Sequence, residues 1–419
     1  MRRSGAEVLV PIAFGYSTAA TRSLAATFVS LGLAYGIWYS YSVFLVALLR
    51  EFGWSRSVLA GAFSIFTLVH GAAGLPLGWL ADRVGPRRLV LVGGALLGLA
   101  LCLDAAATRP WHLYVTFGLL TSAGVALAGW VPAVILVQRW FPHRVGTAIG
   151  ITSSGIGTGI FLVVPTCQWL IDTVGWRWAW RIAGVVVCAW IVPAALFLIK
   201  DPPPASARAT AVPLDEGLTL RYALSHRAFW LLGAAQAATS FANQMLLVHQ
   251  VVYLVDHGIT TLIAASVVSV VGLSSMVGKA GGGWLSDHID RRITFTISAA
   301  AVGCSVGVLG LLALSPSPAW AYLYGVLIGI GYSAPAAIFP ALVSDRFRGR
   351  HYGAIFGALS VANALGGGLG PWVAGRVFDV RGTYAPAFIA AVIGAAVSTA
   401  AIWGVGRGRP ASPTPGAPS

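Results

Sequence analysis

Long apolar blocks alternate with short polar segments along most of the chain. Each block holds about 20 residues or more, enough to cross the hydrocarbon layer of a bilayer as a helix. The pattern indicates an all-α membrane protein with twelve transmembrane helices in two six-helix bundles. The predicted helices cover residues 22–49, 57–80, 89–107, 112–138, 145–170 and 180–199, then 228–254, 261–285, 293–314, 319–343, 352–378 and 384–405.

A polar, proline-rich segment separates the first six predicted helices from the second six. It begins with Asp201, which three prolines follow, and it ends near Arg227. Turn-forming residues of this kind mark a linker rather than a membrane helix. We therefore expect an N-terminal bundle over residues 1–199, a cytoplasmic linker over 200–227, a C-terminal bundle over 228–405 and a disordered tail over 406–419.

Composition supports a membrane location, because 57% of the residues are hydrophobic and only 10% are charged. A soluble protein has roughly 25% charged residues. The net charge of +14 comes from arginines in short loops, so we expect a bilayer and no nucleic acid as partner. The four cysteines lie in apolar segments without metal-ligand spacing, which argues against a disulfide framework and a metal site.

Basic residues are distributed unequally between the two ends of the predicted helices. Most lie at the ends shared by the N-terminus, the linker and the C-terminus, and these ends are therefore expected to be cytoplasmic. The opposite ends hold only Arg50, Arg56, Arg109, Arg177, Arg181, Arg376 and Arg381.

The two halves share a repeated motif. The segment from Gly78 to Asp82 returns as Gly283 to Asp287, and a pair of arginines follows each copy. A glycine there allows close helix approach, while the acid can cap or pair at the helix end. A six-plus-six duplication is typical of secondary transporters with a site between the halves. The candidate conformational residues are Gly78, Asp82, Arg83, Gly283, Asp287 and Arg291.

The first copy of the motif, residues 78–88, resembles the loop 2–3 signature of the major facilitator superfamily. Within it the chain is similar to the bacterial monocarboxylate and oxalate/formate transporter group. That similarity lies in Glu51–Arg56, in Arg139–Arg144 with Gly146, Gly150 and Gly155, and in Phe339–Asp345 with Gly370, Pro371 and Asp379. The resemblance implies the major facilitator fold, alternating access by rocking of the halves, and a bacterial inner-membrane location.

One lysine is predicted to lie deep in the bilayer. Lys279 precedes Asp287 by eight residues, roughly 12 Å along a helix, in a hydrocarbon layer about 30 Å thick. A cation there costs at least about 2.5 kcal/mol, so Lys279 is expected to face the protein interior or a water-filled cavity. Snorkelling to the headgroups fits poorly at this depth. In the group that the chain resembles, a basic residue of helix 8 binds the substrate carboxylate, and Lys279 occupies the matching position.

Other polar and aromatic residues are candidates for the same cavity. Gln236, Ser240 and Asn243 share one helix face, which can contact either substrate or a neighbouring helix. The predicted substrate-binding residues besides Lys279 are Asn243, Tyr35, Tyr39, Tyr332 and Phe356, although the tyrosines of helix 1 also fit core packing. His70 and His249 are proton-coupling candidates that can instead form hydrogen bonds between helices.

At three positions the sequence differs from the group that it resembles, and these differences affect which substrate is expected. Ser275 stands where some relatives carry an acid one turn before the basic residue, and the helix 1 lysine of animal relatives is absent. A second basic residue in helix 11 is also absent. One cavity cation suits one carboxylate better than two, and the missing acid leaves proton symport open.

We therefore expect a monomeric secondary transporter of small organic anions, above all monocarboxylates, coupled to protons or a counter-anion. No cofactor motif or catalytic constellation is evident, so no cofactor and no enzymatic activity are expected. The alternatives are an exporter of drugs or other uncharged solutes on the same fold, and a sensor or scaffold without transport.

Overall fold

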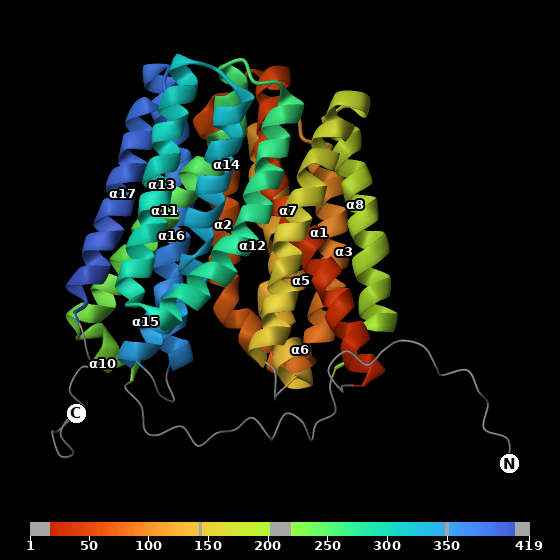
Figure 1. Ribbon diagram of the computed structural model, residues 1–419. Helices are drawn as coiled ribbons and strands as arrows, with labels where there is room; N and C mark the ends of the chain where they lie inside the picture. Colours follow the sequence, from red (N-terminus) through yellow and green to blue (C-terminus); the bar gives the residue numbers. More distant parts are fainter. Residues whose placement is uncertain (1–16, 142–144, 202–218, 348–351, 407–419) are drawn as a thin grey trace, which may run out of the picture.

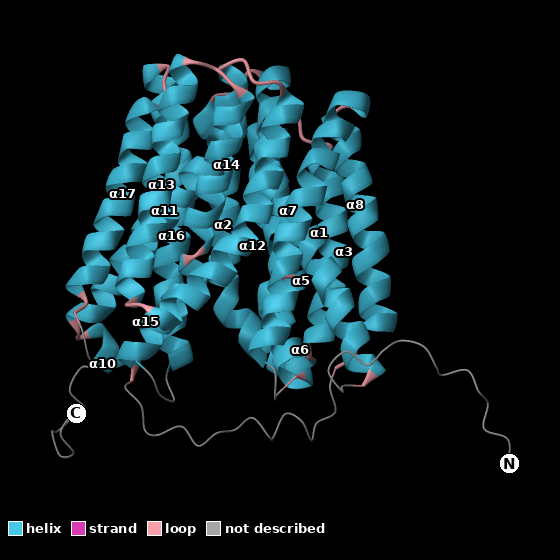
Figure 2. Cartoon of the chain, viewed as in Figure 1, coloured by secondary structure: helices cyan, strands magenta, loops and turns pink. Residues whose placement is uncertain are grey.

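The computed structural model describes residues 17–141, 145–201, 219–347 and 352–406. These residues form long helices that run side by side, joined by short loops, without a strand among them (Figures 1 and 2). Most of the predicted linker and all but the first residue of the predicted tail lie outside the described residues.

The N-terminal bundle contains six membrane-spanning segments. Its elements are α1 (Thr18–Phe52), α2 (Arg56–Val84), α3 (Pro86–Asp104), α4 (Pro110–Leu113), the π-helix η2 (Tyr114–Thr121), α5 (Ser122–Ala128), α6 (Trp130–Trp140), α7 (Val145–Val174), α8 (Trp176–Pro193) and the π-helix η3 (Ala194–Leu198). The segments from α4 to α6 and from α8 to η3 each span the membrane as one unit.

The C-terminal bundle follows a short helix, α10 (Leu220–Leu224), at the end of the linker. Its elements are α11 (Arg227–Asp256), α12 (Thr261–His288), α13 (Arg291–Leu314), α14 (Pro318–Ser333), α15 (Pro335–Phe347), α16 (Tyr352–Arg381) and α17 (Ala385–Gly404). Among the described helical segments, eleven are long and apolar enough to cross a membrane. The twelfth is α11, which is 30 residues long and carries the polar stripe that includes Asn243.

The predicted helices are confirmed, but two of them are interrupted. Helix 4, predicted as continuous over 112–138, contains the π-helix η2 and breaks at Gly129, which has φ −96° and ψ −141°. Helix 10, predicted over 319–343, divides into α14 and α15 at Ala334. Pro335 follows directly, and proline lacks the N–H that would continue the hydrogen bonds of α14.

In each bundle, one pair of helices is in close backbone contact at two glycines four residues apart. In α7, a Cβ atom on Gly155 or Gly159 would overlap the carbonyl oxygens of Phe28 and Gly32 on α1. In α16, a Cβ on Gly366 or Gly370 would likewise overlap the carbonyl oxygens of Ala237 and Phe241 on α11. Both pairs use glycines four residues apart, the spacing that lets membrane helices approach most closely. The internal duplication is therefore visible in the packing as well as in the loops.

We expect Gly159→Ala to lower the thermal stability of the purified protein, because the added methyl group has no space beside the Gly32 carbonyl. Overpacking of this kind costs typically about 1–3 kcal/mol. Thermal unfolding in detergent, followed by size-exclusion chromatography, measures the change. The control is Gly307→Ala on α13, where a Cβ meets no described atom within 4 Å and should cause no loss. Equal melting temperatures for the two variants would contradict the packing argument.

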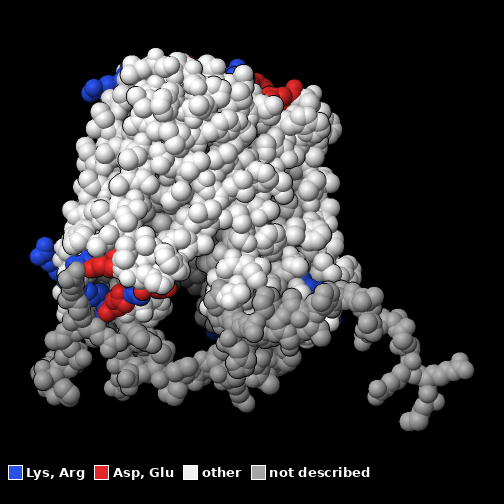
Figure 3. Space-filling model, in the orientation of Figure 1, with Lys and Arg blue, Asp and Glu red and all other residues white. Residues whose placement is uncertain are grey.

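The two bundles contact each other along α2 with α16 and along α7 with α12. We call the end of the molecule where α1 begins and α17 ends the open end, and the opposite end the closed end. At the open end, the space-filling surface is hollowed between the bundles, whereas it is continuous toward the closed end (Figure 3). Figure 1 shows the same arrangement, with α6 and α15 apart at the lower edge of the view.

Candidate functional site

Lys279 lines a cavity of about 760 Å³ that lies where α7 and α12 diverge. The two helices cross closely at Gly157 and Gly272, where a Cβ on either glycine would lie 2.9 Å from the other's carbonyl oxygen. Beyond the crossing they separate, and α6 and α15 complete the wall. The lining residues are Trp130, Ile149, Gly150, Ser153, Ser154, Ile156, Met276, Val277, Lys279, Ala280, Ala336 and Ala337.

The side chain of Lys279 is half-buried, and within the described part of the chain it forms no ion pair and no hydrogen bond. A cation in a low-dielectric setting is stabilised by a counter-charge or by water. The protein supplies no counter-charge to this amine in the described residues.

A second cavity, of about 260 Å³, holds most of the other predicted substrate-binding residues. Tyr39 on α1, Asn243 on α11, Tyr332 on α14 and Phe356 on α16 all line it, and the rings of Tyr39 and Tyr332 lie 6.3 Å apart. Its further lining residues include the polar side chains of Gln236, Thr239, Ser240, Gln244 and Asn363. Ala336 at the start of α15 lines both cavities. The structure therefore places Lys279 next to this group of residues, in a separate compartment.

Tyr35 lies in an aromatic cluster of the N-terminal bundle and lines neither cavity. Its ring stacks on Trp38 at 5.4 Å, and the ring of His70 lies 4.6 Å from Trp38 and 6.1 Å from Tyr35. A Cβ on Gly129 would lie 3.5 Å from the Tyr35 ring. Tyr35 thus contacts the break before α6, one residue from Trp130 in the Lys279 cavity. The Nδ1 atom of His70 is buried and lacks a hydrogen-bond partner among the described residues.

His249 lies outside both cavities, buried between α11, α16 and the segment before α17. Its Nε2 is 2.8 Å from the carbonyl oxygen of Pro371, and its Nδ1 is 2.9 Å from the hydroxyl of Tyr384. A carbonyl only accepts, so Nε2–H donates to Pro371 and Nδ1 accepts from Tyr384. This is the hydrogen bonding between helices that the sequence left open as the alternative to proton transfer.

A cluster around Arg56 joins the two bundles at the closed end. The guanidinium of Arg56 donates to Asp256 at 2.6 Å and to the hydroxyl of Tyr384 at 2.8 Å. The backbone N–H groups of Arg56 and Ser57 donate to the carboxylate of Asp379 at 2.9 and 3.0 Å. The guanidinium also lies 3.6 Å from the centroid of the Phe378 ring. One arginine of α2 thus contacts three parts of the C-terminal bundle.

The sequence identified Arg56 as a basic residue of the outer side and, with Asp379, as part of a family resemblance, but it did not pair the two. The available signal was an isolated basic residue and two acids at helix ends expected on the same side of the membrane. Pairing them requires the spatial neighbourhood of α2, α11 and α16, which the sequence does not show.

The repeated motif differs between its two copies in this conformation. No described atom lies within 4 Å of a Cβ placed on Gly78, so the close helix approach expected there is absent. The reason is its position at the open end, where the bundles have separated. At Gly283 the nearest atom is the Cβ of Ala337, at an ordinary 3.6 Å. Arg83 lies over the ring of Trp79 at 3.8 Å, and the side chain of Asp82 lies outside the described residues.

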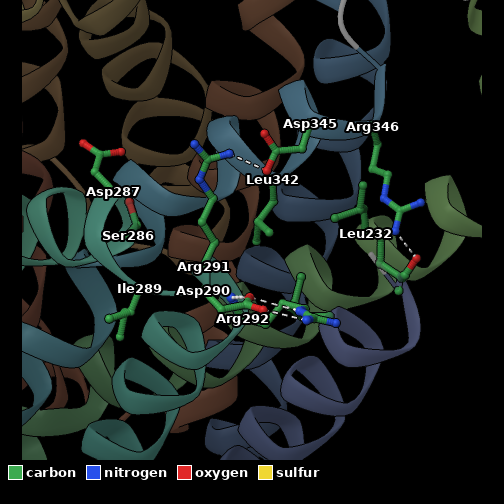
Figure 4. Close-up of a pocket in the computed structure, with 13 residues that line it drawn as sticks. Leu232, Ser286, Asp287, Ile289, Asp290, Arg291, Arg292, Leu342, Asp345 and Arg346 are labelled. Carbon is green, nitrogen blue, oxygen red and sulfur yellow. Dashed lines mark hydrogen bonds and ion pairs between the residues drawn. The ribbon is translucent and has the colours of Figure 1, made fainter. Parts of the chain in front are cut away.

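Charged residues of the second copy gather around a cavity of about 510 Å³ at the open end (Figure 4). Arg291 forms an ion pair with Asp345 on α15, and Arg292 pairs with Asp290 at 2.6 Å. Asp287 lines the same cavity. Since Arg291 and Asp345 both belong to the C-terminal bundle, these contacts hold that bundle together and do not bridge the two halves.

Known proteins resemble this chain over most of its length. The family model of the Major Facilitator Superfamily matches residues 27–371, with a second match over 283–418. Monocarboxylate transporter 13 of Bos taurus is 28% identical over 369 residues, covering 87% of this chain and 84% of that protein. Monocarboxylate transporter 11 of Homo sapiens is 29% identical, covering 87% and 78% respectively.

A bacterial relative and a solved structure extend the comparison. The oxalate:formate antiporter of Oxalobacter formigenes is 25% identical over 349 residues, covering 81% of each chain. The solved structure is a bacterial homologue of the human lysosomal transporter Spinster in an inward-facing and occupied conformation. It aligns with a TM-score of 0.73 at 17% identity, covering 93% of this chain and 97% of that one. This likeness shows the fold alone. With the family match over more than half of its length, the chain is a multi-pass membrane transporter that belongs to the major facilitator superfamily.

Proposed function

We propose that the protein is a secondary active transporter of small organic anions, above all monocarboxylates. The observation that carries this proposal is the amine of Lys279, which lines a cavity between the bundles without a protein counter-charge in the described residues. A carboxylate that enters this cavity accepts a charge-assisted hydrogen bond from the amine. The names of relatives that transport monocarboxylates or exchange oxalate for formate support the same substrate class.

The transport cycle follows from the two ends of the molecule. The distribution of basic residues supports a cytoplasmic location for the open end, both termini and the linker. The membrane that we propose is a bacterial inner membrane. The described conformation then faces inward, with the Arg56 cluster closing the outer side. Rocking of one bundle against the other opens that side and closes the hollow, so the site is exposed alternately.

The energy source is a gradient of protons or of a second anion. His70 is the titratable candidate nearer to the site, because its aromatic cluster reaches the wall at Trp130 through Tyr35. His249 is positioned differently, behind the closed-end cluster, where both of its nitrogens are engaged. We treat the protein as a monomer, since each chain contains a complete pair of bundles.

We expect purified protein in liposomes to accumulate labelled lactate above the level of protein-free liposomes. Counterflow, in which vesicles preloaded with unlabelled lactate take up the label, tests for anion exchange. An imposed pH gradient without preloading tests for proton symport. The amide of the same acid is the matched neutral solute. Uptake of the amide at the rate of the acid would contradict an anion transporter and favour an exporter of uncharged solutes.

A further inference from the structure

The Lys279 cavity is chemically one-sided. Among the described lining residues its amine is the one charged group, and the surrounding side chains are the indole of Trp130 and the aliphatic groups of Ile149, Ile156, Met276 and Val277, with three alanines. A volume of about 760 Å³ lies within the range of roughly 300–1,000 Å³ typical of sites for drug-sized ligands. A two- or three-carbon acid would leave most of this apolar wall in contact with water.

The two serines of the lining do not offer their protons to a ligand. The hydroxyl of Ser153 donates to the carbonyl oxygen of Gly150 at 2.9 Å, and that of Ser154 donates to Ile151 at 2.7 Å. Each hydroxyl therefore presents only lone pairs to the cavity, which repel an anion. A second carboxylate, or a carbonyl far from Lys279, would lose its water without gaining a donor, and this loss disfavours binding.

Polar side chains that could serve a hydrophilic cargo lie in the other compartment. Gln236, Asn243, Gln244 and Asn363 line the smaller cavity beyond Ala336. The helix face that carries Gln236 and Asn243, which can contact either substrate or a neighbouring helix, thus lines a different cavity from the cation. A cargo held by Lys279 rests mainly on apolar groups of α6, α7 and α12.

From this separation we infer the chemical class of the cargo: an amphipathic monoanion, with one carboxylate and an apolar body larger than a methyl group. The carboxylate binds the amine of Lys279, and the body lies against Trp130, Ile149, Met276 and Val277. This inference rests on the proposed function, since it needs an anion site at Lys279, but it adds a preference that the proposed function does not require.

Equilibrium binding to the purified full-length protein tests the preference. The probes are acetate, lactate, oxalate, phenylacetate and the uncharged 2-phenylethanol, each competed against labelled phenylacetate in a scintillation proximity assay. We expect phenylacetate to bind at least about tenfold more tightly than acetate or lactate, since one methylene in an apolar pocket already gives about 10–200-fold. Oxalate and 2-phenylethanol should bind more weakly than phenylacetate, the first because it has two charges and the second because it has none.

Two substitutions test whether the apolar cavity wall causes the preference for phenylacetate. Val277→Ser replaces a side chain that is 64% exposed and lines the cavity, so it should leave the fold intact. Trp130→Ala removes the largest apolar group. Both should lower the ratio of phenylacetate to acetate affinity by about fivefold or more. The matched control is Val185→Ser on α8, where valine is 62% exposed and lies outside the lining, and this variant should keep the ratio.

These outcomes distinguish a failure of the inferred cargo class from a failure of the proposed anion transport. If acetate or lactate binds as tightly as phenylacetate and both need Lys279, the anion site stands and the amphipathic cargo is wrong. If 2-phenylethanol binds as tightly as phenylacetate, neither stands. An unchanged affinity ratio in both Val277→Ser and Trp130→Ala would also overturn the inference.

Discussion

Replacing Lys279 by alanine abolishes carboxylate uptake in proteoliposomes while the protein still folds: this is the result that we expect. The amine is the one cation among the described residues that line its cavity, so its loss removes the charge-assisted hydrogen bond to the cargo. Truncating one member of a buried charge pair costs about 2–5 kcal/mol, which corresponds to a loss of affinity of about 30-fold to several thousandfold. The measurement is the initial rate of uptake by reconstituted protein.

Stability gives this prediction an independent check. Because Lys279 has no partner among the described residues, its removal breaks no ion pair and leaves no unpaired acid there. Removing an unpaired buried cation relieves a desolvation penalty, so the melting temperature in detergent should stay equal or rise.

The chain offers a matched control, since it contains only one other lysine. Lys200 lies at the linker edge, and its described hydrogen bonds use only its backbone, to Ser23 and Trp140. Lys200→Ala should therefore transport normally, and Lys279→Arg should retain part of the uptake because it keeps the charge. Normal uptake by Lys279→Ala would remove the basis for an anion site at this position.

The second large effect is expected at the closed end. Arg56→Gln should release α2 from α11, α16 and Tyr384, because the substitution removes the charge that Asp256 and Tyr384 both contact. Asp256 and Asp379 of the C-terminal bundle then face α2 without the positive charge of the guanidinium. Coupling free energies of 1–3 kcal/mol shift a conformational equilibrium about 5–150-fold, so the outward-open state should become measurably populated.

Labelling of a cysteine placed at Leu247 reports this shift, because Leu247 lines the smaller cavity. In a background without the four native cysteines, we expect a membrane-impermeant maleimide added outside to react at least about five times faster in Arg56→Gln. Transport should fall, since the inward-facing state is no longer sealed. Arg109→Gln is the control, as this exposed arginine lies at the same end and forms no ion pair among the described residues. Equal labelling rates in all three proteins would show that the cluster does not close this end.

Hydropathy predicted the order and approximate extent of the helices well, because the bilayer imposes length and apolarity on every spanning segment. It did not predict the break at Gly129 or the division at Ala334, because both lie within continuous apolar segments and mean hydropathy does not register a single glycine or proline. Hydropathy also did not predict the complete burial of Asp104. This acid ends α3 and accepts a hydrogen bond from Thr121 at 2.9 Å inside the N-terminal bundle.

The candidate site was predictable only in part. The depth of Lys279 follows from counting residues along one helix, which needs no tertiary information. The grouping of Tyr39, Asn243, Tyr332 and Phe356 in a compartment without the lysine depends on where α15 begins relative to α12. The position of Tyr35 behind the wall likewise depends on the broken helix 4. These contacts join helices that are distant in sequence, and they cannot be predicted from one sequence alone.

The glycine contacts between α1 and α7, and between α11 and α16, have a mechanical consequence. Where a carbonyl oxygen fills the space that a methyl group would need, two helices cannot slide past or tilt against each other without a collision. Each of these pairs therefore moves as one rigid unit during turnover, and rocking of the two bundles leaves the packing within each pair unchanged.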